Sequence, residues 1–445
     1  MTTLPAPEVL ASPIRRTAIR LVGQSGRRER EAIHLFRWLL AIYTGIVITK
    51  IHELVPVVNR LQPAKIVGVL LLATAFIVLR PRSILAVLRS PPAACVLVIS
   101  LLAVLSVPGA VWPGNSAAFL ATVYWKTLLL FVISATAWCD RVTLRRTLAV
   151  LVICQTVVAV ALLTGAAHAV VGRAYVGTAL DPNESALQLL VVIPFALYIA
   201  ASGGAWKPIG IASMLLLVAG VVRTGSRAGF IGLIVLAGWM LVQVRPRRRR
   251  WMASLAVAAG AVVVVLTASD ATRQRFSTIL HPTEDYNFTY REGRVDVWKR
   301  GLGYMWRRPI FGVGVQDFPV AEGVLSGKKN EGYGIKYSAA HNMFVQIGAE
   351  LGVIGLLAFS RMLWAAAAGS RRIRRLGRTV VTVDPKLAKH ESNLAEAALG
   401  ALVALLVGGF FLSVAYAPVT FFVVAVCIAV RLGSPLPTWA GGGGR

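Results

Sequence analysis

The feature that most constrains this chain is a series of long apolar runs, two of which cover residues 116–138 and 343–366. A helix needs roughly 20 mainly apolar residues to cross the hydrocarbon core of a bilayer. Hydrophobic residues make up 56% of the chain, whereas a soluble globular domain has roughly 45–50%. The sequence therefore predicts an all-α, polytopic integral membrane protein built as one helical bundle.

The apolar runs predict about twelve transmembrane helices. They cover residues 35–51, 64–80, 92–108, 116–138, 147–168, 185–201, 209–222, 228–244, 251–268, 343–366, 394–413 and 417–431. The chain then divides into a basic cytoplasmic N-terminal segment, nine helices, a long external loop, three further helices and a flexible C-terminal tail. These parts are residues 1–34, 35–268, 269–342, 343–431 and 432–445. A loop of that length suggests a function or disorder.

Basic segments between the runs predict the orientation. The stretches "RPRSILAVLR", "DRVTLRR" and "RRIRRLGR" all fall on one side of the membrane if the predicted helices are correct. Lys and Arg concentrate in the cytoplasmic loops of membrane proteins, so that side is predicted to be the cytoplasm. The same bias explains most of the net charge of +28. Nucleic acid is therefore not expected as a partner.

Cysteine and acidic residues do not indicate a metal or cofactor site. Cys95, Cys139, Cys154 and Cys427 are scattered without a C-x-x-C pair, which favours buried apolar positions over a disulfide or zinc framework. The predicted external loops contain no DxD pair, so a metal-bound nucleotide-sugar site is not indicated. We expect neither a metal nor a cofactor.

Two arginines lie in the short external connection "RTGSRAG", which begins at Arg223 and contains Arg227. An arginine at the end of a membrane helix often reaches to lipid headgroups, and this alternative stays open, above all for Arg223. The residues around Arg227 are small and leave room for a ligand. A guanidinium binds phosphate through two parallel hydrogen bonds, so Arg227 is a candidate anion-binding residue.

The long loop carries a second basic cluster. Its members are Arg291, Arg294, Lys299, Arg300, Arg307 and Arg308. The positive-inside bias would not place such a cluster outside the membrane, so an external anion is expected, either a lipid-linked phosphate or diphosphate or anionic headgroups. Val295, Trp298, Leu302 and Met305 recur at helical spacing in the same segment. This spacing predicts an amphipathic helix on the membrane surface.

His341 stands just before the tenth predicted helix, in "AAHNMFVQIGAELGVIG". A single loop histidine is more often structural than catalytic, but an ordinary pKa of about 6.5 lets it accept a proton near neutrality. The neighbouring Asn342 could orient His341 or cap the helix that follows. Lys126 and Glu350 are predicted to be buried charges within membrane helices, where an ionisable residue is a functional candidate by default.

Four stretches, in this order, resemble the O-antigen ligase and Wzy-type polymerase superfamily. They are "DPNES", "TGSRAG", "REGRVDVWKRGLGYMWRRPIFGVGVQDF" and "AAHNMFVQIGAELGVIG". The resemblance covers roughly residues 177–366 together with the plan of twelve helices. The most specific part is the block "RRPIFGVG" followed by "HN" before a glycine-broken helix, whereas the early helices match only in hydropathy.

The resemblance implies a glycosyltransferase of the bacterial cytoplasmic (inner) membrane whose active site faces the periplasm. Its donor would be a glycan on undecaprenyl diphosphate. Its acceptor hydroxyl would belong to lipid A core for a ligase, to an O-antigen or exopolysaccharide repeat unit for a polymerase, or to a protein side chain. A chain-length regulator protein is a candidate partner of a polymerase.

The same resemblance implies roles for individual residues. Arg227 and Arg294 would hold the diphosphate, and His341 would be the general base that activates the acceptor, without a metal. Further substrate contacts are expected from Arg223, Arg291, Arg300, Asn342 and Asn183. Two other classes of protein stay open. A transporter or flippase of lipid-linked substrates would need polar residues along several helices near the bilayer midplane, and a purely structural membrane protein would leave the external arginines unexplained.

Overall fold

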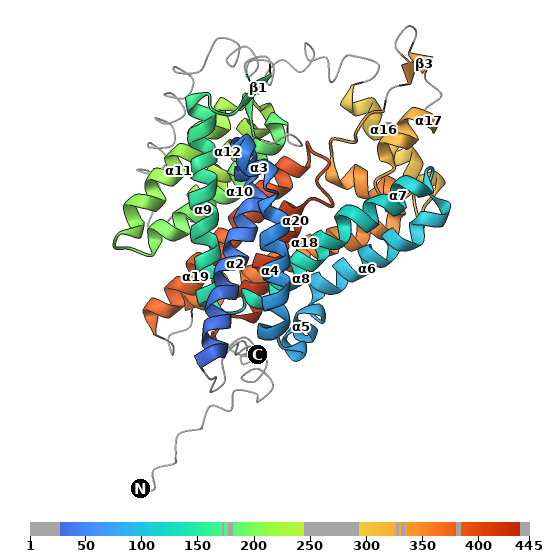
Figure 1. Ribbon diagram of the computed structural model, residues 1–445. Helices are drawn as coiled ribbons and strands as arrows, with labels where there is room; N and C mark the ends of the chain where they lie inside the picture. The colour runs from blue at the N-terminus through green and yellow to red at the C-terminus, as the bar shows by residue number, and fades with distance from the viewer. Residues whose placement is uncertain are drawn as a thin grey trace, which may run out of the picture.

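The structure is a computed structural model that describes residues 27–170, 173–176, 181–243, 293–325, 329–330, 334–335, 337–379 and 384–436. Nearly all of the regular structure is helical (Figure 1). The elements up to the middle of the chain are α2 (Arg27–Thr49), η1 (Ile51–Leu54), α3 (Pro56–Arg60), α4 (Pro63–Val78), α5 (Pro81–Leu88), α6 (Pro91–Ser106), η2 (Val107–Gly109), α7 (Pro113–Phe119), η3 (Leu120–Tyr124), α8 (Trp125–Ala137), α9 (Arg141–Thr164), β1 (His168–Val170) and β2 (Arg173–Tyr175).

The remaining elements contain the predicted site. They are α10 (Pro182–Ala201), α11 (Trp206–Arg223), α12 (Arg227–Gln243), α16 (Arg294–Arg307), α17 (Phe318–Leu325), β3 (Lys329–Asn330), β4 (Gly334–Ile335), α18 (Met343–Thr379), α19 (Pro385–Gly409) and α20 (Pro418–Leu432). In the described residues, strands form only two short antiparallel hairpins, β1–β2 and β3–β4. The predicted all-α bundle is therefore confirmed.

Eight helices of the described part are long and apolar enough to cross a membrane. The bent pair α4 and α5 would count as one further span, and α12 and α20 are shorter apolar helices. Every predicted span coincides with one of these helices except residues 251–268, which lie outside the described residues. The chain is thus a multi-pass membrane protein, and the total of twelve spans stays a prediction.

Proline determines where many of these helices begin. Helices α4, α6, α10, α19 and α20 each start with Pro, whose preset φ suits the first helical turn and whose missing N–H would have no partner there. The same residue type separates α4 from α5, because Pro81 keeps Arg80 extended at φ −87° and ψ 135°. The two helices consequently meet at 103°.

The core lies around α10. Residues 185–196 of this helix are all buried, and α10 packs against α9, α11, α12 and α19. A second buried helix, α20, packs against α8, α18 and α19. Helices α3, α16 and α17 and the hairpin strand β1 lie at one end of the bundle, whereas α5 lies at the other (Figure 1). This division agrees with the loops predicted from charge to be external and cytoplasmic.

Two details of exposure differ from expectation. Lys126 lies within the candidate span Pro113–Ala137, but its side chain is exposed on the surface of the described chain, 6.0 Å from the centroid of the Trp125 ring, so it is not enclosed by protein. The predicted apolar face of α16 is also divided, because Met305 is buried against the protein while Leu302 is 44% exposed. The inner face of α16 packs against α18, and that contact determines its orientation.

Candidate functional site at four helix N-termini

The residues of the candidate site lie at the N-terminal ends of four helices. Arg227 is the first residue of α12, and Arg294 is the first residue of α16. Asn183 lies in the first turn of α10, and His341 stands two residues before α18. The unpaired N–H groups of a helix start carry a partial positive charge, which makes such an end suited to anions.

Hydrogen bonds join the start of α10 to the turn before α12. The Oδ1 atom of Asn183 accepts a hydrogen bond from the hydroxyl of Ser226 at 2.7 Å. It also accepts one from Nη2 of Arg173 at 2.9 Å, and Nδ2 of Asn183 donates to Asp181 at 3.1 Å. Asp181 caps α10 by accepting from the amides of Asn183 and Glu184, each at 2.8 Å. Ser226 directly precedes Arg227, so this network holds the backbone that carries Arg227.

The backbone of His341 is held by a hydrogen bond, and the residue is half-buried. Its amide donates to Oγ of Ser413 at 2.8 Å, and its φ of 46° places it in the left-handed region. The side chain of Asn342 caps α18, because its Oδ1 accepts from the amides of Phe344 at 2.9 Å and Val345 at 3.1 Å. This is the usual way in which Asn starts a helix.

The environment of His341 favours its neutral form. Burial lowers the pKa of His341 below its ordinary value, and the positive charge of Arg294 lowers it further, whereas Asp181 raises it. Two positive groups repel each other, so a proton on the imidazole is disfavoured beside Arg294. Arg294 and Asp181 thus both lie close enough to affect the charge of His341, although the three residues come from three different helix ends.

Helix α16 is attached to the segment that carries His341. The indole Nε1 of Trp298 donates to the carbonyl oxygen of Ala340 at 2.8 Å. The Trp298 ring also packs edge-on against Phe410, with 5.4 Å between centroids. Since Arg294 begins the same helix one turn earlier, these contacts determine where Arg294 lies relative to His341.

Residues 309–318, here called the glycine loop, form hydrogen bonds with the backbone of α18 at a break in that helix. Gly352 interrupts the helix at φ 69° and ψ −169°. The amides of Val313 and Gly314 donate to the carbonyls of Ala349 and Glu350, at 2.9 Å and 3.2 Å, and the amide of Val353 donates to Pro309 at 2.8 Å. These bonds replace those that the break removes from the helix, so few backbone groups are left unpaired.

The glycine loop also accepts hydrogen bonds from residues 112–116, in the first half of the chain. The backbone amide of Trp112 and Nδ2 of Asn115 donate to the carboxylate of Asp317, at 2.6 Å and 2.7 Å. The hydroxyl of Ser116 donates to the carbonyl of Val315 at 2.7 Å. The segment "VWPGNS", which connects two of the predicted membrane helices, therefore supports the block "FGVGVQDF".

Several predicted site residues have structural partners. The guanidinium of Arg300 donates to the buried carboxylate of Glu322, with Nη2–Oε2 at 2.5 Å and Nε at 3.0 Å from both oxygens. Glu322 also accepts from the Tyr304 hydroxyl at 2.9 Å. Asn342 is used as a helix cap and Asn183 as the centre of its network. Their roles in substrate binding stay predictions, and the geometry favours support of the site over direct contact.

The two remaining predicted substrate contacts are Arg223 and Arg291. Arg223 ends α11 with its side chain exposed, and Arg291 lies outside the described residues. Sequence reasoning missed Arg173 and Asp181, which both belong to the network around Asn183. A signal for Arg173 existed, because it is a lone arginine in a predicted external loop. Asp181 precedes a proline at a helix start, which is the signature of a capping residue.

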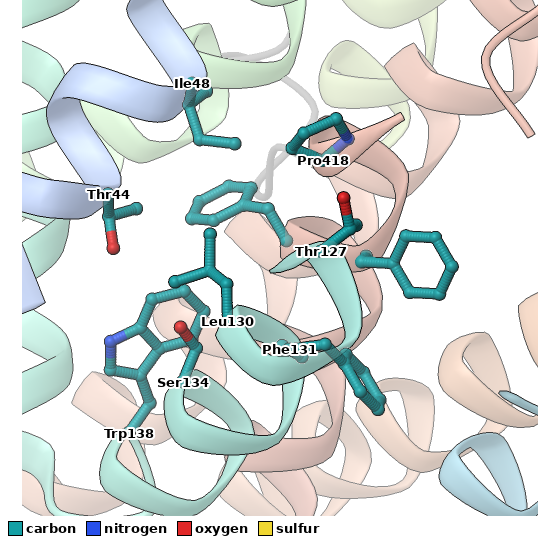
Figure 2. A pocket seen from close by; sticks show the side chains of 11 residues that line it. Thr44, Ile48, Thr127, Leu130, Phe131, Ser134, Trp138 and Pro418 are labelled. Atoms are coloured by element: carbon teal, nitrogen blue, oxygen red, sulfur yellow. The ribbon is translucent and has the colours of Figure 1, made fainter. Parts of the chain in front are cut away.

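A small internal cavity does not belong to this site. It lies between α2, α8 and α20 and is lined mainly by apolar side chains, with the hydroxyls of Thr44, Thr127 and Ser134 among them (Figure 2). Its volume of about 10 Å³ is close to the minimum for one water molecule. No candidate site residue lines it, and it has no room for a sugar or a lipid chain.

Comparison with known proteins gives a family match over the part of the chain that contains most of these helix ends. Residues 212–360 match the family model described as O-antigen ligase, which confirms the resemblance seen in the sequence. The matched segment contains Arg227, Arg294 and His341, the glycine loop and the break at Gly352. It supports a ligase or polymerase role in glycan assembly. No curated protein matches the chain. In the described ranges, no three His, Cys, Asp or Glu side chains are grouped as metal ligands would be.

Proposed function

We propose that this chain, whose residues 212–360 match the O-antigen ligase family, transfers a glycan from undecaprenyl diphosphate to a hydroxyl acceptor. The transfer would take place at the periplasmic face of the cytoplasmic membrane. The observation that carries the proposal is that the charges of Arg294 and Asp181 both act on His341, while Asp181 and Asn183 belong to the hydrogen-bond network at the turn before Arg227. This arrangement combines a proton acceptor with anion-binding groups.

The arginines would act on the carrier. Arg227 and Arg294 each begin a helix, so a diphosphate held there would meet a guanidinium and the positive end of a helix together. Negative charge increases on the diphosphate as its bond to the sugar breaks. Charge-assisted hydrogen bonds from arginine that strengthen with this charge lower the barrier.

His341 would act on the acceptor. A neutral imidazole nitrogen takes the proton of the acceptor hydroxyl while the hydroxyl oxygen attacks the anomeric carbon of the donor sugar. The bond between that carbon and the diphosphate oxygen breaks, and undecaprenyl diphosphate leaves with the electron pair. The lowered pKa of His341 supports this role, because the imidazole is unprotonated, and so able to accept a proton, at neutral pH.

The proposal is tested with purified protein in nanodiscs, a lipid-diphosphate-linked glycan and an acceptor glycan. Arg227→Lys and Arg294→Lys should each lose most transfer activity while the protein remains folded, since lysine keeps the charge but loses the two-pronged geometry. Arg378→Lys is the matched control, because Arg378 is an exposed arginine near the C-terminal end of α18 that donates to Glu396 at 2.8 Å and has no predicted role at the site. Wild-type turnover in both variants would contradict this role and would mean that the two arginines contact lipid headgroups instead.

The acceptor separates a ligase from a polymerase. Deletion of the gene would leave polymer unattached to lipid A core if the protein is a ligase. It would leave single repeat units on the carrier if the protein is a polymerase. Normal envelope glycans after deletion would contradict both roles.

A further inference from the structure

We propose that Arg173 is a positioning residue for Arg227. It would act through Asn183 and the turn at residues 224–226, without being one of the groups that react. The inference rests on the proposed function, because it concerns how the carrier diphosphate is held. It adds to the site a residue of the external hairpin β1–β2, which lies outside the segment that matches the family model.

The guanidinium of Arg173 joins both parts that meet at this turn. Its Nη2 donates to Oδ1 of Asn183 at 2.9 Å, and its Nε donates to the carbonyl oxygen of Thr224 at 3.3 Å. One side chain therefore holds the start of α10 and the end of α11 at the same time. A planar guanidinium can make both bonds from its rigid fork, whereas the single ammonium of lysine cannot reproduce that geometry.

Asn183 transmits this constraint to Arg227. Its Oδ1 accepts from Arg173 and also from Ser226, and Ser226 Oγ in turn accepts from the amide of Gly229 at 3.1 Å. Ser226 thus caps the helix that Arg227 begins. The direction of the first turn of α12 depends on Ser226, and the position of Ser226 depends on the oxygen that it shares with Arg173.

Close packing leaves the turn little freedom. Gly225 adopts φ 59°, and a Cβ atom at this position would lie 3.4 Å from Cγ of Arg173. The stem of Arg173 therefore lies against the turn, and the side chain of Thr224 is buried beneath it. Thr224 Oγ1 donates to the carbonyl of Val221 at 2.6 Å and accepts from the amide of Ser226 at 3.2 Å. Loss of the guanidinium would remove the outer support of this turn.

The experiment is a double-mutant cycle on donor binding. Undecaprenyl diphosphate is titrated into the full-length protein in nanodiscs for the wild type, Arg173→Lys, Arg227→Ala and the double variant. If Arg173 acts through Arg227, Arg173→Lys should weaken binding about tenfold in the wild-type background and less than twofold when Arg227 is already absent. The same loss in both backgrounds would show direct contact with the diphosphate and overturn the positioning role, as would no loss in the wild-type background.

A second measurement does not depend on the ligand. Hydrogen–deuterium exchange of the amides at residues 224–229 should be faster in Arg173→Lys than in the wild type, and unchanged in the control Arg378→Lys. Unchanged exchange in Arg173→Lys would overturn the inference whatever the binding result. If Arg173→Lys does not fold, Asn183→Ala removes the shared acceptor and should give the same pattern. Failure of the wild type to bind undecaprenyl diphosphate, with the exchange result as expected, would instead count against the proposed function.

Discussion

The carboxylate of Glu350 accepts a hydrogen bond from the backbone amide of Gln316 at 2.9 Å. Its other oxygen accepts from the amide of Phe318 at 3.3 Å, and the residue is 1% exposed. Glu350 thus joins the broken helix α18 to the glycine loop. The sequence suggested Glu350 as a functional charge within a membrane helix, but the structure gives the carboxylate a supporting role behind the site.

We expect Glu350→Ala to destabilise the protein strongly, because it leaves the buried amide of Phe318 and the partly buried amide of Gln316 without an acceptor. Each unsatisfied buried group costs about 1–3 kcal/mol. Glu350→Gln keeps one carbonyl oxygen and should cause a smaller loss. The measurement is thermal unfolding of both variants in the same detergent. A Glu350→Gln variant that unfolds like the wild type but transfers no glycan would place the carboxyl group in the chemistry.

The break in α18 gives a second prediction. Gly352→Ala should reduce stability by several kcal/mol, because alanine disfavours φ 69° by about 1–2 kcal/mol and its Cβ would lie 2.2 Å from the carbonyl oxygen of Pro309. Gly303→Ala is the matched control, since no heavy atom lies within 4 Å of a Cβ atom there and alanine favours the helix that contains it. The two variants are compared by thermal unfolding. Equal unfolding temperatures would mean that α18 continues without a break.

Hydropathy was enough to find the membrane helices of the described part, but not their ends. The tenth predicted helix stops at residue 366, whereas α18 continues to Thr379 through "RRIRRLGR". Arginine is a good helix former and is favoured near a helix C-terminus, so the helix extends past the apolar run into the basic segment. Likewise α19 begins at Pro385, nine residues before its apolar run.

The candidate site could be predicted in part, because motif residues mark positions but not partners. His341 and Arg227 were found as polar residues beside apolar runs and Arg294 as a member of the basic cluster in the long loop, and the roles expected of all three came from the family resemblance. The bonds of Arg173 to Asn183 and Thr224 join residues 10 and 51 positions apart, and no local pattern encodes such a pairing. Arg300 looked like an anion ligand for the same reason, since its partner Glu322 lies 22 residues away.

The orientation predicted from charge can be tested by cysteine labelling. Tyr337→Cys should react with a membrane-impermeant maleimide from the outside, and Arg371→Cys should react only after the membrane is opened. Both positions are exposed in the structure. Background labelling should be low, because the four native cysteines are free but buried or half-buried. The reverse pattern would place the candidate site on the cytoplasmic side and contradict the proposed function.

The pH dependence of transfer tests the role of His341. Burial and Arg294 lower the pKa of His341 below its ordinary value, so the imidazole stays neutral and able to accept a proton to a lower pH than a free histidine would. Plotted against pH, kcat/KM should therefore fall on the acid side with a midpoint below about 6.5. His341→Gln should bind the donor but show no transfer, because glutamine cannot take up the proton.

Asp181 offers an independent check on the same titration. Its negative charge raises the pKa of His341, so removal of that charge should move the acid midpoint of kcat/KM to a still lower pH. Asp181→Asn is the suitable variant, because asparagine also caps helices and can keep the bonds from the amides of Asn183 and Glu184. Donor binding should change little. A midpoint that does not move, or that moves to higher pH, would mean that the group titrating on the acid side is not His341.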